Sequence, residues 1–158
     1  VTEAGTEKYG TIKSAIGIGS LLNDGIGDTI RVSLTGNPLL EIPVAQRILM
    51  SLGLIKKGVE IISCPTCGRC QLDLLNLVNQ VEQYVHDLGF PLKLAIMGCV
   101  VNGPGEARDA DLGIAGGNGQ GLIFKKGKIV RKVKEEELLP ALLSEIEKIR
   151  RSGFDEIQ

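Results

Sequence analysis

Aromatic residues are scarce in this sequence: there is no tryptophan, and only two tyrosines and three phenylalanines occur among 158 residues. A hydrophobic core must therefore be built from Ile, Leu and Val, which the 43% apolar composition can supply. The length suits one domain with a real core, or one domain joined to a fragment of another.

Neither sign of charge is in excess, since the sequence contains 18 Lys and Arg residues and 19 Asp and Glu residues. This balance gives no support for a nucleic-acid partner. Long apolar runs are also missing, and none approaches the ~20 residues that a membrane span needs. With no secretion signal visible either, we expect a cytoplasmic protein without a membrane partner. The sequence opens on Val1 rather than on Met, so we expect it to be cut from a longer protein.

The first fifty residues alternate between strand and helix patterns. This alternation predicts parallel strands covered by helices. In the first helix, Ile12, Ala15, Ile16 and Gly19 share one face, which we expect to lie close to a sheet. The predicted elements are the end of a strand at 1–4, a helix at 12–22, a strand at 28–34 and a helix at 40–52.

A different pattern follows the segment 54–58, so we place a domain boundary between residues 53 and 54. Residues 54–158 are expected to form a compact α+β domain, with glycine-rich turns between short strands. The predicted strands are 59–63, 92–97, 112–115, 122–124 and 128–133, and the predicted helices are 71–88 and 135–151.

The four cysteines indicate a metal centre. Cys64, Cys67 and Cys70 form a C-x2-C-x2-C run, and Cys99 follows the second predicted strand. Three cysteines this close do not suit a disulfide framework, whereas such a loop can offer thiolates to different irons of one cluster. The spacing favours an iron–sulfur cluster over zinc, and zinc over buried structural cysteines.

Glu106 is a fifth candidate ligand, because the Gly103-Pro104-Gly105 turn can bring it back beside Cys99. Composition alone would favour the four cysteines, since thiolate suits cluster iron better than carboxylate does. Arg69 and Arg108 could add positive potential near such a cluster, although solvent-exposed arginines are the commoner case.

Several long segments resemble one enzyme family, the 4-hydroxy-3-methylbut-2-enyl diphosphate synthases. They are VTEAG, IKSAIGIG, GIGDTIRVSLTGNP, CPTCGR and MGCVVNGPGEARDADLGIAGG, which together cover nearly the whole chain. Asn37 is a small departure, at a position where the family often has Asp. In that family three cysteines and one glutamate hold a [4Fe–4S] cluster. The resemblance assigns these roles to Cys64, Cys67, Cys99 and Glu106, and gives Cys70 no ligand role.

The resemblance also implies a fold. Residues 1–53 would be the last two strand–helix units of a TIM-type barrel. Residues 54–158 would be a compact α+β iron–sulfur domain of the sulfite/nitrite-reductase-like kind.

The implied reaction is the reduction of 2-C-methyl-D-erythritol 2,4-cyclodiphosphate to 4-hydroxy-3-methylbut-2-enyl diphosphate, in the methylerythritol phosphate route to isoprenoids. The resemblance makes Thr2, Arg31 and Ser33 substrate-binding residues and makes Glu3 an acid/base candidate. Glu106 would act in catalysis as a ligand that can be displaced. Ferredoxin or flavodoxin would supply electrons, and the whole enzyme would be a homodimer.

The rival class is an iron–sulfur electron carrier, or a zinc-stabilised binding module, without chemistry of its own. Such a module has no need of Glu3, Arg31 or Ser33. From the residues alone, however, Arg31 and Ser33 could simply be the polar face of a solvent-exposed strand. A guanidinium that offers two parallel N–H donors does suit a phosphate group.

Overall fold

A computed structural model describes residues 5–100 and 103–152 of the chain. The chain divides into two units, Val1–Lys57 and Gly58–Gln158, and each is described by itself. No helix in the described part of the chain is long and apolar enough to cross a membrane.

The first unit is helical. It contains α1 (Glu7–Asn23), the short 3-10 helix η1 (Pro38–Leu40) and α2 (Glu41–Ser51). Its small core joins Ile18 of α1 to Val44 and Ile48 of α2, with Val32 of the intervening segment. The segment 28–34 forms no strand, in contrast to the prediction, and one parallel bridge joins Thr6 to Thr35. A strand exists only by pairing with a neighbour, and no neighbouring strand is described in this unit.

The face of α1 that we predicted to be buried is largely exposed. Ile12 is 57% exposed and Ile16 is 68% exposed, whereas Gly19, from the same predicted face, is buried together with Gly10, Ser14 and Ile18. Both sets of residues recur at helical spacing, so periodicity alone could not choose between them. The smaller side chains of Gly10 and Ser14 allow a closer approach, and the helix buries that face.

The second unit is built on a five-stranded mixed sheet in the order β1-β2-β3-β4-β5. The first three strands run parallel, and β4 and β5 add antiparallel neighbours. The mixture follows from the connections, because helices join the parallel strands and tight glycine turns join the rest. The strands are β1 (Val59–Ser63), β2 (Leu92–Met97), β3 (Leu112–Gly117), β4 (Gln120–Lys125) and β5 (Lys128–Lys134).

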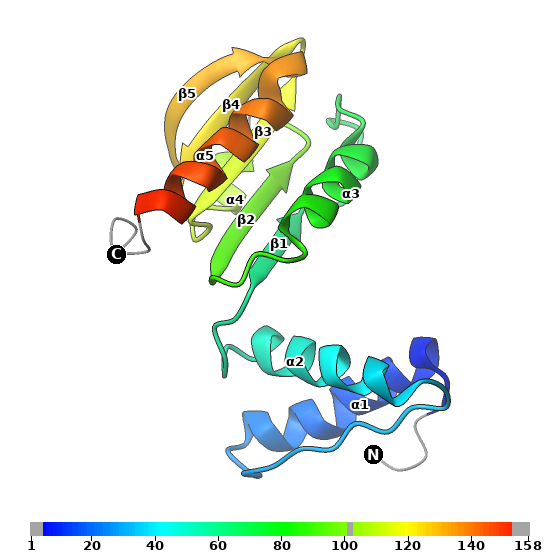
Figure 1. Cartoon of the computed structure of the whole chain (residues 1–158). Helices are drawn as coiled ribbons and strands as arrows, with labels where there is room; N and C mark the ends of the chain where they lie inside the picture. The colour runs from blue at the N-terminus through cyan, green and yellow to red at the C-terminus, as the bar shows by residue number, and fades with distance from the viewer. Residues whose placement is uncertain (1–4, 101–102, 153–158) are drawn as a thin grey trace. The chain divides into compact units, whose positions relative to one another are not determined.

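Helices cover both faces of this sheet. The helices α3 (Leu74–Val85) and α5 (Leu138–Ser152) lie on one face, and the single-turn helix α4 (Gly103–Glu106) lies on the other (Figure 1). A short 3-10 helix, η2 (Glu135–Glu137), precedes α5.

The inward faces of the strands alternate accordingly. Leu94, Ile96 and Ile114 pack in the larger core with α3 and α5, whereas Ala95 and Met97 pack in a smaller core. Ala107, just after α4, belongs to this smaller core. Most residues of this smaller core are alanines, which lets α4 lie close to the sheet.

Candidate metal centre

The three clustered cysteines occupy a loop that begins where β1 ends. Cys64 follows Ser63 directly, and the backbone N–H of Cys70 donates to the Cys67 carbonyl at 2.9 Å, which closes a turn between them. The next amide, that of Gln71, donates to the Gly98 carbonyl at 3.4 Å. The loop is therefore joined to the end of the neighbouring parallel strand β2.

Gly98 is the point where this loop and β2 meet. Its backbone N–H donates to the Cys64 sulfur at 3.2 Å. A Cβ added at Gly98 would lie 2.5 Å from the Cys70 sulfur and 3.5 Å from the Cys64 sulfur. The Cys70 sulfur thus occupies the space that a side chain at this position would fill, and the Cys64 sulfur lies at contact distance from it. Cys99 follows Gly98 directly, which places its backbone at the same end of the sheet.

The helix α4 is pressed against that end of the sheet. The Gly103 amide donates to the Cys99 carbonyl at 3.2 Å, which ties the helix to the cysteine. A Cβ added at Gly103 would lie 2.8 Å from the Met97 Cβ and 2.9 Å from the Ala115 Cβ, so only glycine allows this approach. The same turn of helix carries the exposed Glu106.

Arg69 links the candidate ligands electrostatically. Hydrogen bonds from the backbone and side chain of Arg69 lower the pKa of the Cys67 thiol. In turn, the pKa of Arg69 is raised, first by Cys67 and to a smaller extent by the charges of Cys99 and Glu106. Arg69 therefore brings positive potential to three of the four predicted ligands. Arg108, the other arginine considered, lies 3.9 Å from the Asp109 carboxylate.

These side chains are near one another without forming a closed coordination shell. Within residues 5–100 and 103–152, no three His, Cys, Asp or Glu side chains converge closely enough to hold a metal ion. Cys67 is exposed, and Cys64, Cys70 and Cys99 are half-buried. The donor set of thiols and one carboxylate still fits an iron–sulfur cluster chemically. The cradle at Gly98, which a Cβ would fill, fits a site where several sulfurs gather.

Sequence reasoning did not identify Gly98 as the contact point for Cys64 and Cys70. A glycine directly before a candidate ligand is the only local signal of it. The contact itself depends on the parallel pairing of β1 with β2, because that pairing sets Ser63 opposite Ile96. Motif spacing does not include this register.

The predicted substrate-binding residues belong to the first unit. Thr2 and Glu3 lie outside the described residues. Arg31 is exposed and Ser33 is half-buried, and they flank Val32, which is 4% exposed and packs in the core. Arg31 and Ser33 thus flank a core residue, but the predicted strand face is not formed because 28–34 is not a strand. Their role in binding substrate remains a prediction.

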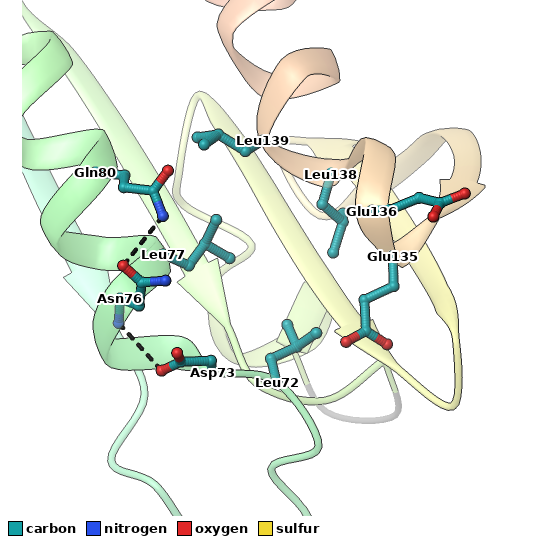
Figure 2. Close-up of a pocket in the computed structure, with 9 residues that line it drawn as sticks. All are labelled: Leu72, Asp73, Asn76, Leu77, Gln80, Glu135, Glu136, Leu138 and Leu139. Atoms are coloured by element: carbon teal, nitrogen blue, oxygen red, sulfur yellow. Dashed lines mark hydrogen bonds between the residues drawn. The ribbon is translucent and has the colours of Figure 1, made fainter.

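A separate pocket of about 170 Å³ opens between the start of α3 and the η2–α5 junction (Figure 2). Its polar groups serve local structure: Asp73 accepts from the Asn76 amide at 3.4 Å, and Asn76 accepts from the Gln80 side chain at 3.1 Å. Glu135 accepts from the Gly119 amide at 3.1 Å. None of the four cysteines lines this pocket, and no motif in the sequence predicts it.

Each of the two units matches a known protein-family model. Residues 60–148 match the family model described as GcpE protein C-terminal domain, and residues 1–46 match the GcpE TIM-barrel domain. The first of these matches covers more than half of the chain. The chain belongs to the GcpE family.

Curated relatives carry the name 4-hydroxy-3-methylbut-2-en-1-yl diphosphate synthase (flavodoxin). The relative from Caldanaerobacter subterraneus subsp. tengcongensis is 64% identical over 94% of this chain and 42% of its own length. The relative from Clostridium perfringens is 62% identical over 94% of this chain and 43% of its own length. The relative from Geobacter sulfurreducens is 58% identical over 94% of this chain and 42% of its own length. This chain therefore spans less than half the length of these relatives, and the resemblance noted from the motifs is confirmed.

Proposed function

We propose that this chain is the cluster-binding portion of an enzyme that makes 4-hydroxy-3-methylbut-2-enyl diphosphate. The observation that carries the proposal is the identity of about 60% with synthases of that name over 94% of the chain. The family-model match at residues 60–148 includes every predicted cluster ligand. The reaction consumes 2-C-methyl-D-erythritol 2,4-cyclodiphosphate, two electrons and two protons, opens the cyclic diphosphate and releases one water.

Within this proposal Cys64, Cys67, Cys99 and Glu106 hold a [4Fe–4S] cluster. Such a cluster, when bound, supplies electrons singly to the substrate. Glu106 is suited to be the exchangeable ligand, because carboxylate is a harder and weaker partner for cluster iron than thiolate is. The exposure of Glu106 on a short helix supports this role, since it leaves the side chain room to move away. Arg69 offsets the negative charge of the ligands beside it.

The first unit would hold the substrate. In a TIM-type barrel, active-site residues lie at the C-terminal ends of the strands. Thr2, Arg31 and Ser33 are proposed to bind the diphosphate there, and Glu3 to act as an acid/base. The guanidinium of Arg31 can donate two parallel hydrogen bonds to a phosphate group.

The wider assembly follows from the same proposal. We propose that residues 54–158 form a domain of the sulfite/nitrite-reductase-like kind, with residues 1–53 ending the barrel. The whole enzyme would be a cytoplasmic homodimer that takes electrons from flavodoxin or ferredoxin. The names of the curated relatives support flavodoxin as the donor.

The test is to purify the full-length protein without oxygen and to measure both its visible spectrum and its turnover. Broad absorption with a brown colour, together with product formation from the cyclic diphosphate under a chemical one-electron reductant, is the expected result. A colourless protein that contains zinc would contradict the cluster assignment. A brown protein that transfers electrons but never forms product would favour the rival reading as an electron carrier.

A further inference from the structure

Positive charge is concentrated on the hairpin of β4 and β5, in a stretch that contains none of the four cysteines. Ten successive residues, from Lys125 to Lys134, include no acidic side chain. The cations among them are Lys125, Lys126, Lys128, Arg131, Lys132 and Lys134. We call residues 125–134 the basic hairpin. The near-zero net charge of the whole chain conceals this local excess.

Much of the charge on the basic hairpin is not neutralised. Lys125 lies 3.0 Å from Glu145, and Lys134 lies 3.8 Å from Glu136. Lys128, Arg131 and Lys132 are exposed, and none of these three lies within ion-pair distance of a carboxylate in the described part of the chain.

An apolar pair sits among these cations. Ile129 is 52% exposed and Val130 is 54% exposed. They lie on β5, an edge strand of the sheet. Cations around an exposed apolar centre are typical of a surface that binds a protein, whereas a nucleic acid would find no aromatic or polar partner at that centre.

The turn of the basic hairpin lies against the segment that carries Glu106. A Cβ added at Gly127 would lie 2.9 Å from the Arg108 Cβ and 3.3 Å from the Pro104 carbonyl oxygen. The Lys126 amide also donates to the Ala110 carbonyl at 3.0 Å. The turn of the basic hairpin therefore contacts α4 and the residues that follow it, the segment that carries Glu106.

We propose that the basic hairpin is the docking surface for an acidic one-electron carrier protein of the flavodoxin class. This inference rests on the proposed function, which needs electrons to be delivered one at a time near Glu106. A carrier with acidic residues around its redox group complements the six cations, and its apolar rim can cover Ile129 and Val130. Complementary charge mainly raises the rate of encounter, and it does so less at high ionic strength.

The test compares two variants of the full-length, cluster-loaded protein. The first replaces three unpaired cations of the basic hairpin: Lys128→Glu, Arg131→Glu and Lys132→Glu. The control makes the same change in net charge at exposed positions elsewhere, with Arg47→Glu, Lys56→Glu and Arg151→Glu. A third variant, with Gln at the three hairpin positions, covers the case in which Glu disturbs the edge strand. Turnover is measured with reduced flavodoxin and, separately, with a chemical reductant.

We expect the hairpin Glu variant to lose at least tenfold in kcat/KM for reduced flavodoxin at low ionic strength. The loss should shrink as salt is added, and the Gln variant should lose less. With the chemical reductant both variants should match the unsubstituted protein, and the control should match it with either donor. Equal flavodoxin kinetics in the hairpin Glu variant and the control would overturn the proposal.

Binding of flavodoxin, measured by calorimetry, separates this proposal from the one on which it rests. Absence of product with the chemical reductant in the unsubstituted protein would contradict the proposed reaction but not the docking surface. Loss of binding to DNA or to anionic lipid vesicles in the hairpin variants, with flavodoxin binding unchanged, would overturn the docking proposal in favour of another anionic partner.

Discussion

At the scale of single residues, the open question is which side chain completes the ligand set. Spacing favours Cys70, and the family resemblance favours Glu106. Cys70 lies against Gly98, and its sulfur is 3.6 Å from the Leu72 carbonyl oxygen, so it already has a place in the loop. Glu106 is exposed on α4 and lies within the electrostatic reach of Arg69.

We predict that Cys70→Ser retains a full cluster and most of the turnover of the full-length enzyme. Glu106→Ala should lose most of the turnover, because the cluster is then held by one protein ligand fewer and is less stable. Glu106→Cys should keep a cluster and still lose turnover, because thiolate binds iron more firmly. Iron content, electron paramagnetic resonance and product formation measure the three outcomes. Loss of the cluster in Cys70→Ser, with Glu106→Ala fully active, would establish four cysteine ligands instead.

Gly98 provides a second prediction at this scale. Gly98→Ala places a methyl group 2.5 Å from the Cys70 sulfur and 3.5 Å from the Cys64 sulfur, so the loop must shift. Overpacking of this kind costs about 1–3 kcal/mol in unfolding free energy, and we expect less iron to be retained. Urea unfolding and iron content measure the two effects.

Gly89→Ala is a matched control for Gly98→Ala, because a Cβ at Gly89 would meet no atom within 4 Å. It should leave iron content unchanged and alter stability little. If Gly98→Ala behaved in the same way as Gly89→Ala, the sulfurs would not be confined at Gly98 as described.

At the scale of elements, α3 and α5 are joined on one face of the sheet by a hydrogen bond. The Tyr84 hydroxyl donates to the Glu147 carboxylate at 2.7 Å. This bond lowers the pKa of Glu147 and raises the pKa of Tyr84. The stability due to Glu147 is present above its unfolded pKa and is lost as pH falls through the lowered folded value. The stability due to Tyr84 is present below its unfolded pKa and is lost as pH rises through the raised folded value.

We therefore predict that Tyr84→Phe destabilises the chain slightly at neutral pH, and that the difference disappears at both extremes. It should fade as pH falls through the lowered pKa of Glu147, and as pH rises through the raised pKa of Tyr84. Urea unfolding across this range measures the difference. Tyr9→Phe is the control, because Tyr9 is 64% exposed in the other unit. A difference that stayed constant down to pH 3 would show that the hydroxyl acts other than through Glu147.

Elements differ in how far the sequence predicts them. The bounds of β1 and β2 were predicted correctly, because both are short runs rich in Val, Ile and Leu that are bounded by turn residues. The helix predicted from residue 71 begins at Leu74, where Asp73 caps it through the Asn76 amide. The segment 28–34 has the composition of a strand but lacks a described pairing partner. At the site, cysteine spacing predicted the ligand loop, whereas the contact of its sulfurs with Gly98 required the register of β1 with β2.

At the scale of the whole molecule, the chain matches its relatives over only about 42% of their length. Residues 1–46 match the barrel family model, and the described part of that unit contains no paired sheet. Large apolar side chains there are exposed, among them Tyr9, Ile12 and Ile16. The first unit, as described, therefore lacks the strands on which a barrel active site is built.

We predict that the 158-residue chain forms no product from the cyclic diphosphate, even with a reconstituted cluster and a strong chemical reductant. Most of the diphosphate site of a barrel enzyme comes from strands beyond those represented here. Product analysis of the purified chain by mass spectrometry measures this, with a full-length relative as the positive control. Detectable turnover by the chain alone would show that substrate binding needs far less of the barrel than we infer.

The parallel pairing of β1 with β2 also has a consequence during protein synthesis. On the proposed assignment, Cys64 and Cys67 are synthesised before β2 and Cys99. At typical translation rates this interval is on the order of a few seconds. During it the two cysteines have neither their neighbouring strand nor the other proposed ligands. The complete ligand set therefore exists only once translation has passed α4.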